Sequence, residues 1–103
     1  MAFKVIIKPV VWLDVDDALE WYEKESPGLG LRFIKSFEEA KEKLIKQPGA
    51  YKNITPLVKR LLLKNFPYKV FYNLSGDTIF IIGVVHAGRS NAFIKRKLKN
   101  FKS

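Results

Sequence analysis

The residues most able to do chemistry lie in the second half of the chain, where cations alternate with apolar and aromatic side chains. If residues 58–66 form a strand, Arg60 and Lys64 lie on the same face, because side chains alternate with a period of two. Tyr68 and Tyr72 share a face of the following strand for the same reason. Cations beside tyrosines suit the binding of backbone phosphates and the stacking of bases. Equally, the tyrosines can fill the core while the cations line a solvated sheet edge.

A second candidate site follows the last apolar run, where His86 is followed by Arg89. A histidine and an arginine at the end of a buried strand could bind an anion or assist a proton transfer. The alternative is a structural role, in which His86 hydrogen-bonds a neighbouring backbone group. Phosphodiester cleavage could also proceed without the histidine, if arginines and lysines stabilise the transition state around a substrate 2′-OH nucleophile.

The composition excludes several kinds of catalytic site. The chain has no cysteine and a single histidine, so it offers no disulfide, no thiolate metal site and no pair of histidines. Asp77 is the one carboxylate among residues 52–103, and it lies in a predicted turn. We therefore expect neither a metal ion nor another cofactor.

The charge of the chain is concentrated in its second half. The 103 residues carry a formal net charge of +9. Residues 1–51 hold 8 basic and 9 acidic side chains, whereas residues 52–103 hold 11 basic and 1 acidic. This asymmetry favours an anionic partner, a nucleic acid or an acidic protein, over lysines that only keep the protein soluble. The apolar runs are too short to span a membrane, so we expect a cytoplasmic protein.

The apolar pattern predicts a single α+β domain over residues 1–103, in which a helical hairpin packs on one face of a sheet. A three-stranded antiparallel meander is expected to form this sheet together with the first strand. Aspartates at positions 14, 16 and 17 are expected in the opening turns of the first helix, where the helix dipole favours anions. The elements expected, in order, are a strand at Phe3–Lys8, a helix whose apolar stripe holds Val11, Val15, Leu19 and Tyr22, a helix at Leu31–Gln47, strands at Val58–Phe66, Tyr68–Leu74 and Thr78–Val85, and a short basic tail or helix after Asn91.

Several segments, taken in order, resemble the RelE/ParE-type toxins of bacterial type II toxin–antitoxin systems, which include plasmid stabilisation proteins. These segments are Asp17–Glu23 with Ser26–Phe33, the pair Lys59 and Arg60, Phe66–Tyr72, and Val84–Arg89. Each segment alone is a weak signal, but together they cover nearly the whole chain at fitting spacings. The hairpin, the segment at Phe66–Tyr68 and the spacing of His86 and Arg89 look more like the ParE branch.

The resemblance implies a toxin that arrests growth, and its two branches imply different activities. The ParE branch implies inhibition of DNA gyrase through a protein interface. The RelE branch implies a ribosome-dependent mRNA endonuclease without a metal ion, in which Arg60, Lys64, His86 and Arg89 are the matching catalytic candidates. Unlike RelE, the tail after Arg89 offers no tyrosine or histidine. A third alternative is a non-toxic basic module that binds RNA or a partner protein.

The resemblance also implies a small protein antitoxin, and the charge of the chain predicts that its binding segment is acidic. Such a segment is expected to fold onto the basic side of the sheet and along the groove beside the helical hairpin. A homodimer and a toxin–antitoxin hetero-oligomer are both left open. The residues expected to bind the target or the antitoxin are Lys59, Arg60, Lys64, Tyr68, Tyr72, Arg89, Lys95 and Arg96.

Overall fold

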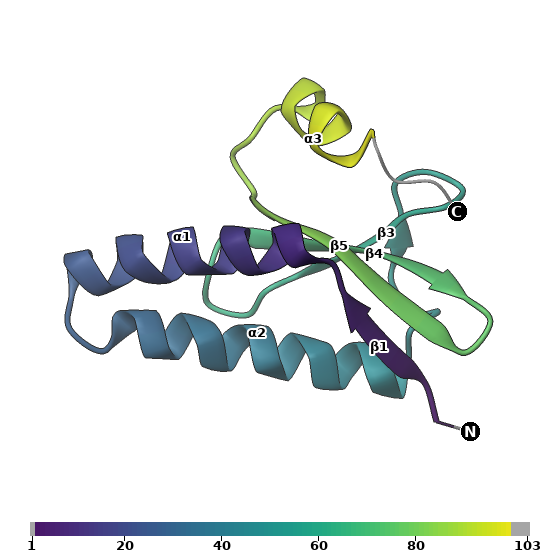
Figure 1. Ribbon diagram of the computed structural model, residues 1–103, viewed down its shortest axis with the longest axis horizontal. Helices are drawn as coiled ribbons and strands as arrows, with labels where there is room; N and C mark the ends of the chain where they lie inside the picture. Colours follow the sequence, from purple (N-terminus) through teal and green to yellow (C-terminus); the bar gives the residue numbers. More distant parts are fainter. Residues whose placement is uncertain (1, 100–103) are drawn as a thin grey trace.

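The computed structural model describes residues 2–99, which form one five-stranded sheet with three helices (Figure 1). The strand order is β1-β5-β4-β3-β2, in which β1 is parallel to β5 and the other neighbours are antiparallel. The predicted α+β fold, with its hairpin, its meander and a C-terminal helix, is confirmed. The elements are β1 (Lys4–Ile7), α1 (Pro9–Glu25), α2 (Leu29–Lys46), β2 (Lys52–Asn53), β3 (Lys59–Leu62), β4 (Tyr68–Ser75), β5 (Thr78–His86) and α3 (Asn91–Leu98).

The structure corrects two of the predicted boundaries and adds one strand. Strand β3 ends at Leu62 rather than at Phe66, because the chain turns before β4, with Asn65 in the left-handed region at a φ of 70°. A two-residue edge strand, β2, was not predicted, because two residues carry no periodic pattern. Helix α2 begins at Leu29 rather than Leu31, after Gly28, whose φ of 89° favours glycine.

The face of the sheet toward α1 and α2 holds the larger core, which includes Val11 and Val15 of α1 and Phe33 and Phe37 of α2. Phe33 is fully buried, and its ring lies 5.3 Å from that of Phe66 and 5.1 Å from that of Tyr68. These helices pack closely: a Cβ added at Gly30 would lie 2.9 Å from the backbone oxygen of Leu19.

Tyr72 belongs to this same core. It is fully buried, and its hydroxyl donates a hydrogen bond of 2.6 Å to the backbone oxygen of Pro48. Burial, and to a smaller extent the neighbouring Tyr51, raises the pKa of Tyr72 to about 12. The prediction that Tyr72 contacts a partner is therefore wrong for this fold, because the side chain reaches no surface and its hydrogen bond is satisfied internally.

The opposite face of the sheet carries a smaller core under α3, which stands apart from the helical hairpin (Figure 1). Phe71, Ile82 and Val85 of the sheet are buried there against Ile94 of α3. A Cβ added at Gly83 would lie 3.3 Å from Leu98, so the glycine lets the helix approach the strand. The two faces of the sheet thus have cores of different size.

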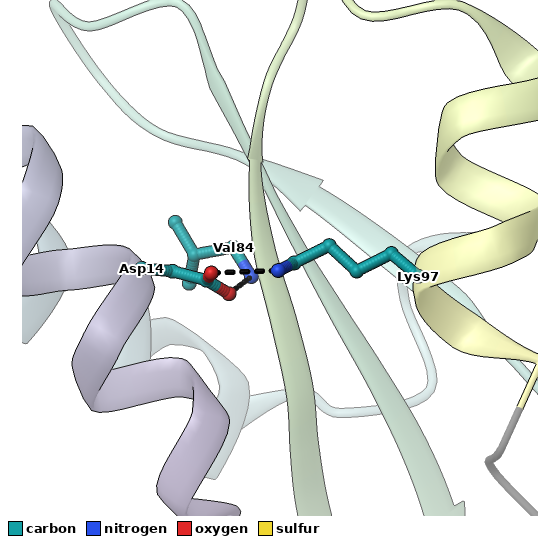
Figure 2. A network of polar contacts seen from close by, with 3 residues as sticks. All are labelled: Asp14, Val84 and Lys97. Atoms are coloured by element: carbon teal, nitrogen blue, oxygen red, sulfur yellow. Dashed lines mark hydrogen bonds and ion pairs between the residues drawn. The ribbon is translucent and has the colours of Figure 1, made fainter.

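Asp14 ties α3 to the rest of the fold (Figure 2). Because β1 accompanies β5 only as far as Ile81, no strand lies beside Val84 on the side away from β4. Its backbone N–H donates instead to the Asp14 carboxylate at 3.2 Å. The Nζ of Lys97 on α3 lies 2.7 Å from the other oxygen of the same carboxylate. Helix α1 begins at Pro9, so Asp14 lies beyond its first turn and links three elements instead of compensating the dipole.

Candidate functional site

A hollow on the α3 face, which we call the basic hollow, has a volume of about 470 Å³. No carboxylate is among its lining residues, and none of its four cations forms an ion pair within residues 2–99. Such a surface attracts anions, because its charges are not neutralised locally. The residues that line it are Lys52, Asn53, Ile54, Thr55, Arg60, Lys69, Phe71, Asn91, Ile94 and Lys95.

The strand register explains why these cations lie together. Arg60 of β3 is opposite Lys52 on one side and Phe71 on the other, so the three side chains share one face. Phe71 is buried in the core under α3, which places this face on the α3 side of the sheet. Helix α3, which packs on this face of the sheet, contributes Lys95 to the hollow. Arg60 and Lys69 are each half-buried, which reduces the water that screens them.

A second hollow, of about 340 Å³, lies between α1, the end of β5 and α3; we call it the histidine hollow. His86, Arg89, Tyr68 and Trp21 are among its lining residues. The guanidinium of Arg89 stacks over Phe93 at 4.5 Å from the ring centre, and the imidazole of His86 packs edge-on against Tyr68 at 5.2 Å. This hollow is of mixed charge, because Asp14, Asp17 and Lys97 also line it.

Two features of the histidine hollow bear on proton transfer. The backbone N–H of Gly88 donates to Nδ1 of His86 at 2.9 Å, so the neutral imidazole carries its proton on Nε2 and presents a donor there. A hydrogen bond of His86 to a neighbouring backbone group is what a structural role for this histidine predicted. Burial raises the pKa of Tyr68, and Arg89 offsets part of that rise, so the tyrosine is protonated at neutral pH. Both groups can donate a hydrogen bond to an anion.

The structure does not bring the four catalytic candidates into one site. Arg60 lines the basic hollow, whereas His86 and Arg89 line the histidine hollow. Lys64 lies in a third hollow against α2, where its backbone oxygen accepts a hydrogen bond of 2.7 Å from Ser36. The prediction that Lys64 shares a strand face with Arg60 fails, because β3 ends before Lys64.

The residues expected to bind a partner are also divided. Lys95 lies beside Arg60 in the basic hollow, and Arg96 is exposed on α3 but lines neither the basic nor the histidine hollow. Lys59 is held internally, since its Nζ donates to Asn53 Oδ1 at 2.7 Å and to the Tyr51 oxygen at 3.2 Å. Tyr68 lies on the face of the sheet toward the helical hairpin, away from the basic hollow.

Two cations of the basic hollow, Lys52 and Lys69, were not among the predicted site residues. Lys69 alternates with the tyrosines of β4, so the period of two that grouped the tyrosines also places it on the other face. In an antiparallel meander this face of β4 lies beside Arg60 of β3, so the sequence pattern could have predicted that Lys69 joins Arg60. Lys52 gave no such signal, because it lies in the unpredicted strand β2.

Within residues 2–99, no group of three or more histidine, cysteine or acidic side chains is placed to hold a metal ion. In the same part of the chain, none of the helices combines the length and the apolar character needed to cross a membrane.

The fold is that of the RelE/ParE class of toxins. Among solved structures, the chain is similar to one of the chromosomal ParDE toxin–antitoxin system from P. aeruginosa, with a TM-score of 0.71 and 19% identity over 82% of this chain and 95% of that one. It is also similar to an E. coli RelE toxin mutant in the free state, with a TM-score of 0.58 and 16% identity over 98% of this chain and 100% of that one. A third is a chain of the archaeal RelE–RelB complex from Pyrococcus horikoshii OT3, with a TM-score of 0.54 and 17% identity over 87% of this chain and 100% of that one.

The sequence itself assigns the branch. Residues 5–91 match the family model of the ParE toxin of the type II toxin–antitoxin system parDE. This chain therefore belongs to the ParE toxin family, as its resemblance predicted. No curated protein sequence gives a match.

Proposed function

We propose that this protein arrests bacterial growth from within the cytoplasm by inhibiting DNA gyrase through a protein interface. The observation that carries the proposal is the match of residues 5–91 to the ParE toxin family. An interface needs no assembled catalytic centre, and the cations of the second half divide among separate hollows.

We further propose that an acidic antitoxin neutralises the toxin. Two of the similar structures are named as toxin–antitoxin assemblies, the ParDE system and the RelE–RelB complex. The net charge of +9 and the acid-free basic hollow support an acidic partner for this chain.

Induced expression in a bacterial host tests the target. We expect growth arrest, loss of negative supercoiling in a reporter plasmid and induction of the DNA-damage response, with translation continuing at first. Purified protein is expected to inhibit supercoiling by purified gyrase. The control is Phe33→Ala, which removes a fully buried ring and is expected to abolish the effect by unfolding the chain. Unimpaired growth at wild-type expression would instead indicate the non-toxic binding module.

The second candidate function is a RelE-like, ribosome-dependent mRNA endonuclease. It is favoured by one observation: His86 and Arg89 lie in a common hollow beside Tyr68, where the three can offer hydrogen bonds to a phosphate. In that case expression stops translation within minutes and yields cleaved mRNA, and Arg89→Ala abolishes cleavage. Arg60→Ala is a second test. If this variant also fails to cleave mRNA, the basic hollow and the histidine hollow both act on one RNA. Both variants must retain the thermal stability of the wild type.

A further inference from the structure

The basic hollow continues into a second, apolar hollow along α3. This apolar hollow, of about 260 Å³, is lined by the loop at residues 54–58 and by α3. The two hollows have Ile54, Thr55, Ile94 and Lys95 in common, so they form one groove, which we call the α3 groove. One end is cationic and the other is aliphatic.

The cationic end has the chemistry of a carboxylate or phosphate receptor. Arg60 offers a planar guanidinium that matches either group with two hydrogen bonds, and Lys69 and Lys52 add positive charge from the neighbouring strands. Among residues 2–99, no acidic side chain lines either half of the groove. An anionic ligand therefore meets no repulsion along its length.

The aliphatic end of the groove favours a peptide ligand over a nucleic acid. Ile54 and Leu57 line this end, and 38% and 47% of their surfaces are exposed. Single-stranded nucleic acids bind by stacking bases on exposed aromatic rings. Within residues 2–99, the one aromatic ring that lines the groove is that of Phe71, which is only 1% exposed. Tyr68 and Tyr72 lie on the opposite face, so the described residues of the groove offer no exposed ring for stacking.

We propose that the α3 groove is the docking site for a short acidic peptide segment that carries a large aliphatic side chain. Its aliphatic side chain fills the hollow beside Leu57, and its carboxylates pair with Arg60 and Lys69. This inference rests on the proposed pairing with an acidic partner and deepens it, because it assigns a place and a sequence character to the segment that binds.

Titration of the full chain with a fluorescein-labelled peptide tests the proposal. The probe is a short peptide of one leucine followed by four glutamates, compared with the same peptide in which every glutamate is glutamine. We expect saturable binding of the glutamate peptide, weakening with salt. The glutamine peptide should bind about a hundredfold more weakly, because it loses the charge-assisted contacts to both Arg60 and Lys69. Equal binding of the two peptides overturns the proposal. Tighter binding of an oligothymidylate of similar length also overturns it and assigns the groove to nucleic acid.

Matched variants locate the binding. Lys69→Gln is expected to weaken binding of the glutamate peptide about tenfold, because it removes one charge-assisted contact. Leu57→Ser is expected to weaken it severalfold by removing the aliphatic contact. The control Lys35→Gln makes the same change of charge on α2, outside the groove, and should leave binding within twofold. An equal loss for Lys35→Gln and Lys69→Gln, or no loss for Leu57→Ser, overturns the assignment.

The protein encoded by the gene next to that of this toxin provides a test in which the groove assignment and the proposed function can fail separately. If that gene encodes an acidic protein that binds the toxin, and neither Lys69→Gln nor Leu57→Ser weakens the complex, the groove assignment is wrong and the toxin–antitoxin pairing stands. If the glutamate peptide binds the groove but expression changes neither growth nor supercoiling, the groove stands and the proposed function is wrong.

Discussion

The two faces of the sheet differ in how completely they are filled. Toward α1 and α2, aromatic and aliphatic side chains close the space, and the polar atoms within it have partners, such as the Tyr72 hydroxyl on the Pro48 oxygen. Toward α3, the core within residues 2–99 has five buried side chains with three partly buried ones packed against them, and the basic hollow with its unpaired cations opens beside them. Since burial of apolar surface is the main stabilising term, the hairpin face must hold the fold.

This division leaves the α3 face free to carry function. Residues that bind a partner are commonly not optimal for stability, because their polar groups await an external ligand. Arg60 and Lys69 fit that description, since they are half-buried and no acidic side chain of the described part of the chain lines the basic hollow with them. If the comparison is right, substitutions on the hairpin face change stability strongly, and those on the α3 face change it little or even favourably.

The largest effect is expected for Phe33→Ala on the hairpin face. The side chain is fully buried among the rings of Tyr22, Phe66 and Tyr68, so its removal should cost about 3–5 kcal/mol of unfolding free energy. Urea unfolding measured by circular dichroism checks this. The comparison variant is Phe93→Ala on α3, which is only partly buried and should cost much less. Equal losses would contradict the difference between the faces.

The sequence predicted the hairpin face well, because its information is local and periodic. The stripe of Val11, Val15 and Leu19 marks the helix, and Pro27 and Gly28 mark its end. By contrast, the groove on the α3 face depends on contacts between distant segments. Nothing near Lys52 in the sequence shows that Lys95 will line the same hollow. Likewise, Asp14 was expected to stabilise the helix dipole, but its carboxylate joins α1 to β5 and α3.

The link between the faces should show an intermediate effect. Asp14→Ala leaves the Val84 N–H without its acceptor and removes the ion pair with Lys97, so we expect a loss of about 1–3 kcal/mol. Lys97→Met removes only the ion pair and should cost at most about 1 kcal/mol. Hydrogen exchange should show faster exchange in α3 for both variants, with Val84 affected only by Asp14→Ala. Faster exchange at Val84 in both would mean that the two contacts are one cooperative unit.

Tyr72→Phe tests the hairpin face through pH. The variant leaves the buried Pro48 oxygen without its donor, at a cost of about 1–2 kcal/mol near neutral pH. Because the pKa of Tyr72 is raised to about 12 from its usual value near 10, the neutral phenol is favoured in the fold. Its stabilisation is complete below pH 10 and is lost as the pH rises toward 12. The stability difference between wild type and variant should therefore shrink over that range, which denaturation at matched pH values measures.

The smallest expected effect has the opposite sign. Arg60 and Lys69 line one hollow with two further cations and no acid, so the double variant Arg60→Gln, Lys69→Gln should stabilise the fold by a few tenths of a kcal/mol at low salt. Salt should abolish this gain, because it already screens the repulsion. The control Lys41→Gln breaks the ion pair of 2.9 Å with Glu38 and should lower stability by a similarly small amount. A destabilised double variant would mean that these cations support the sheet, and their lack of acidic neighbours would then no longer argue for a waiting ligand.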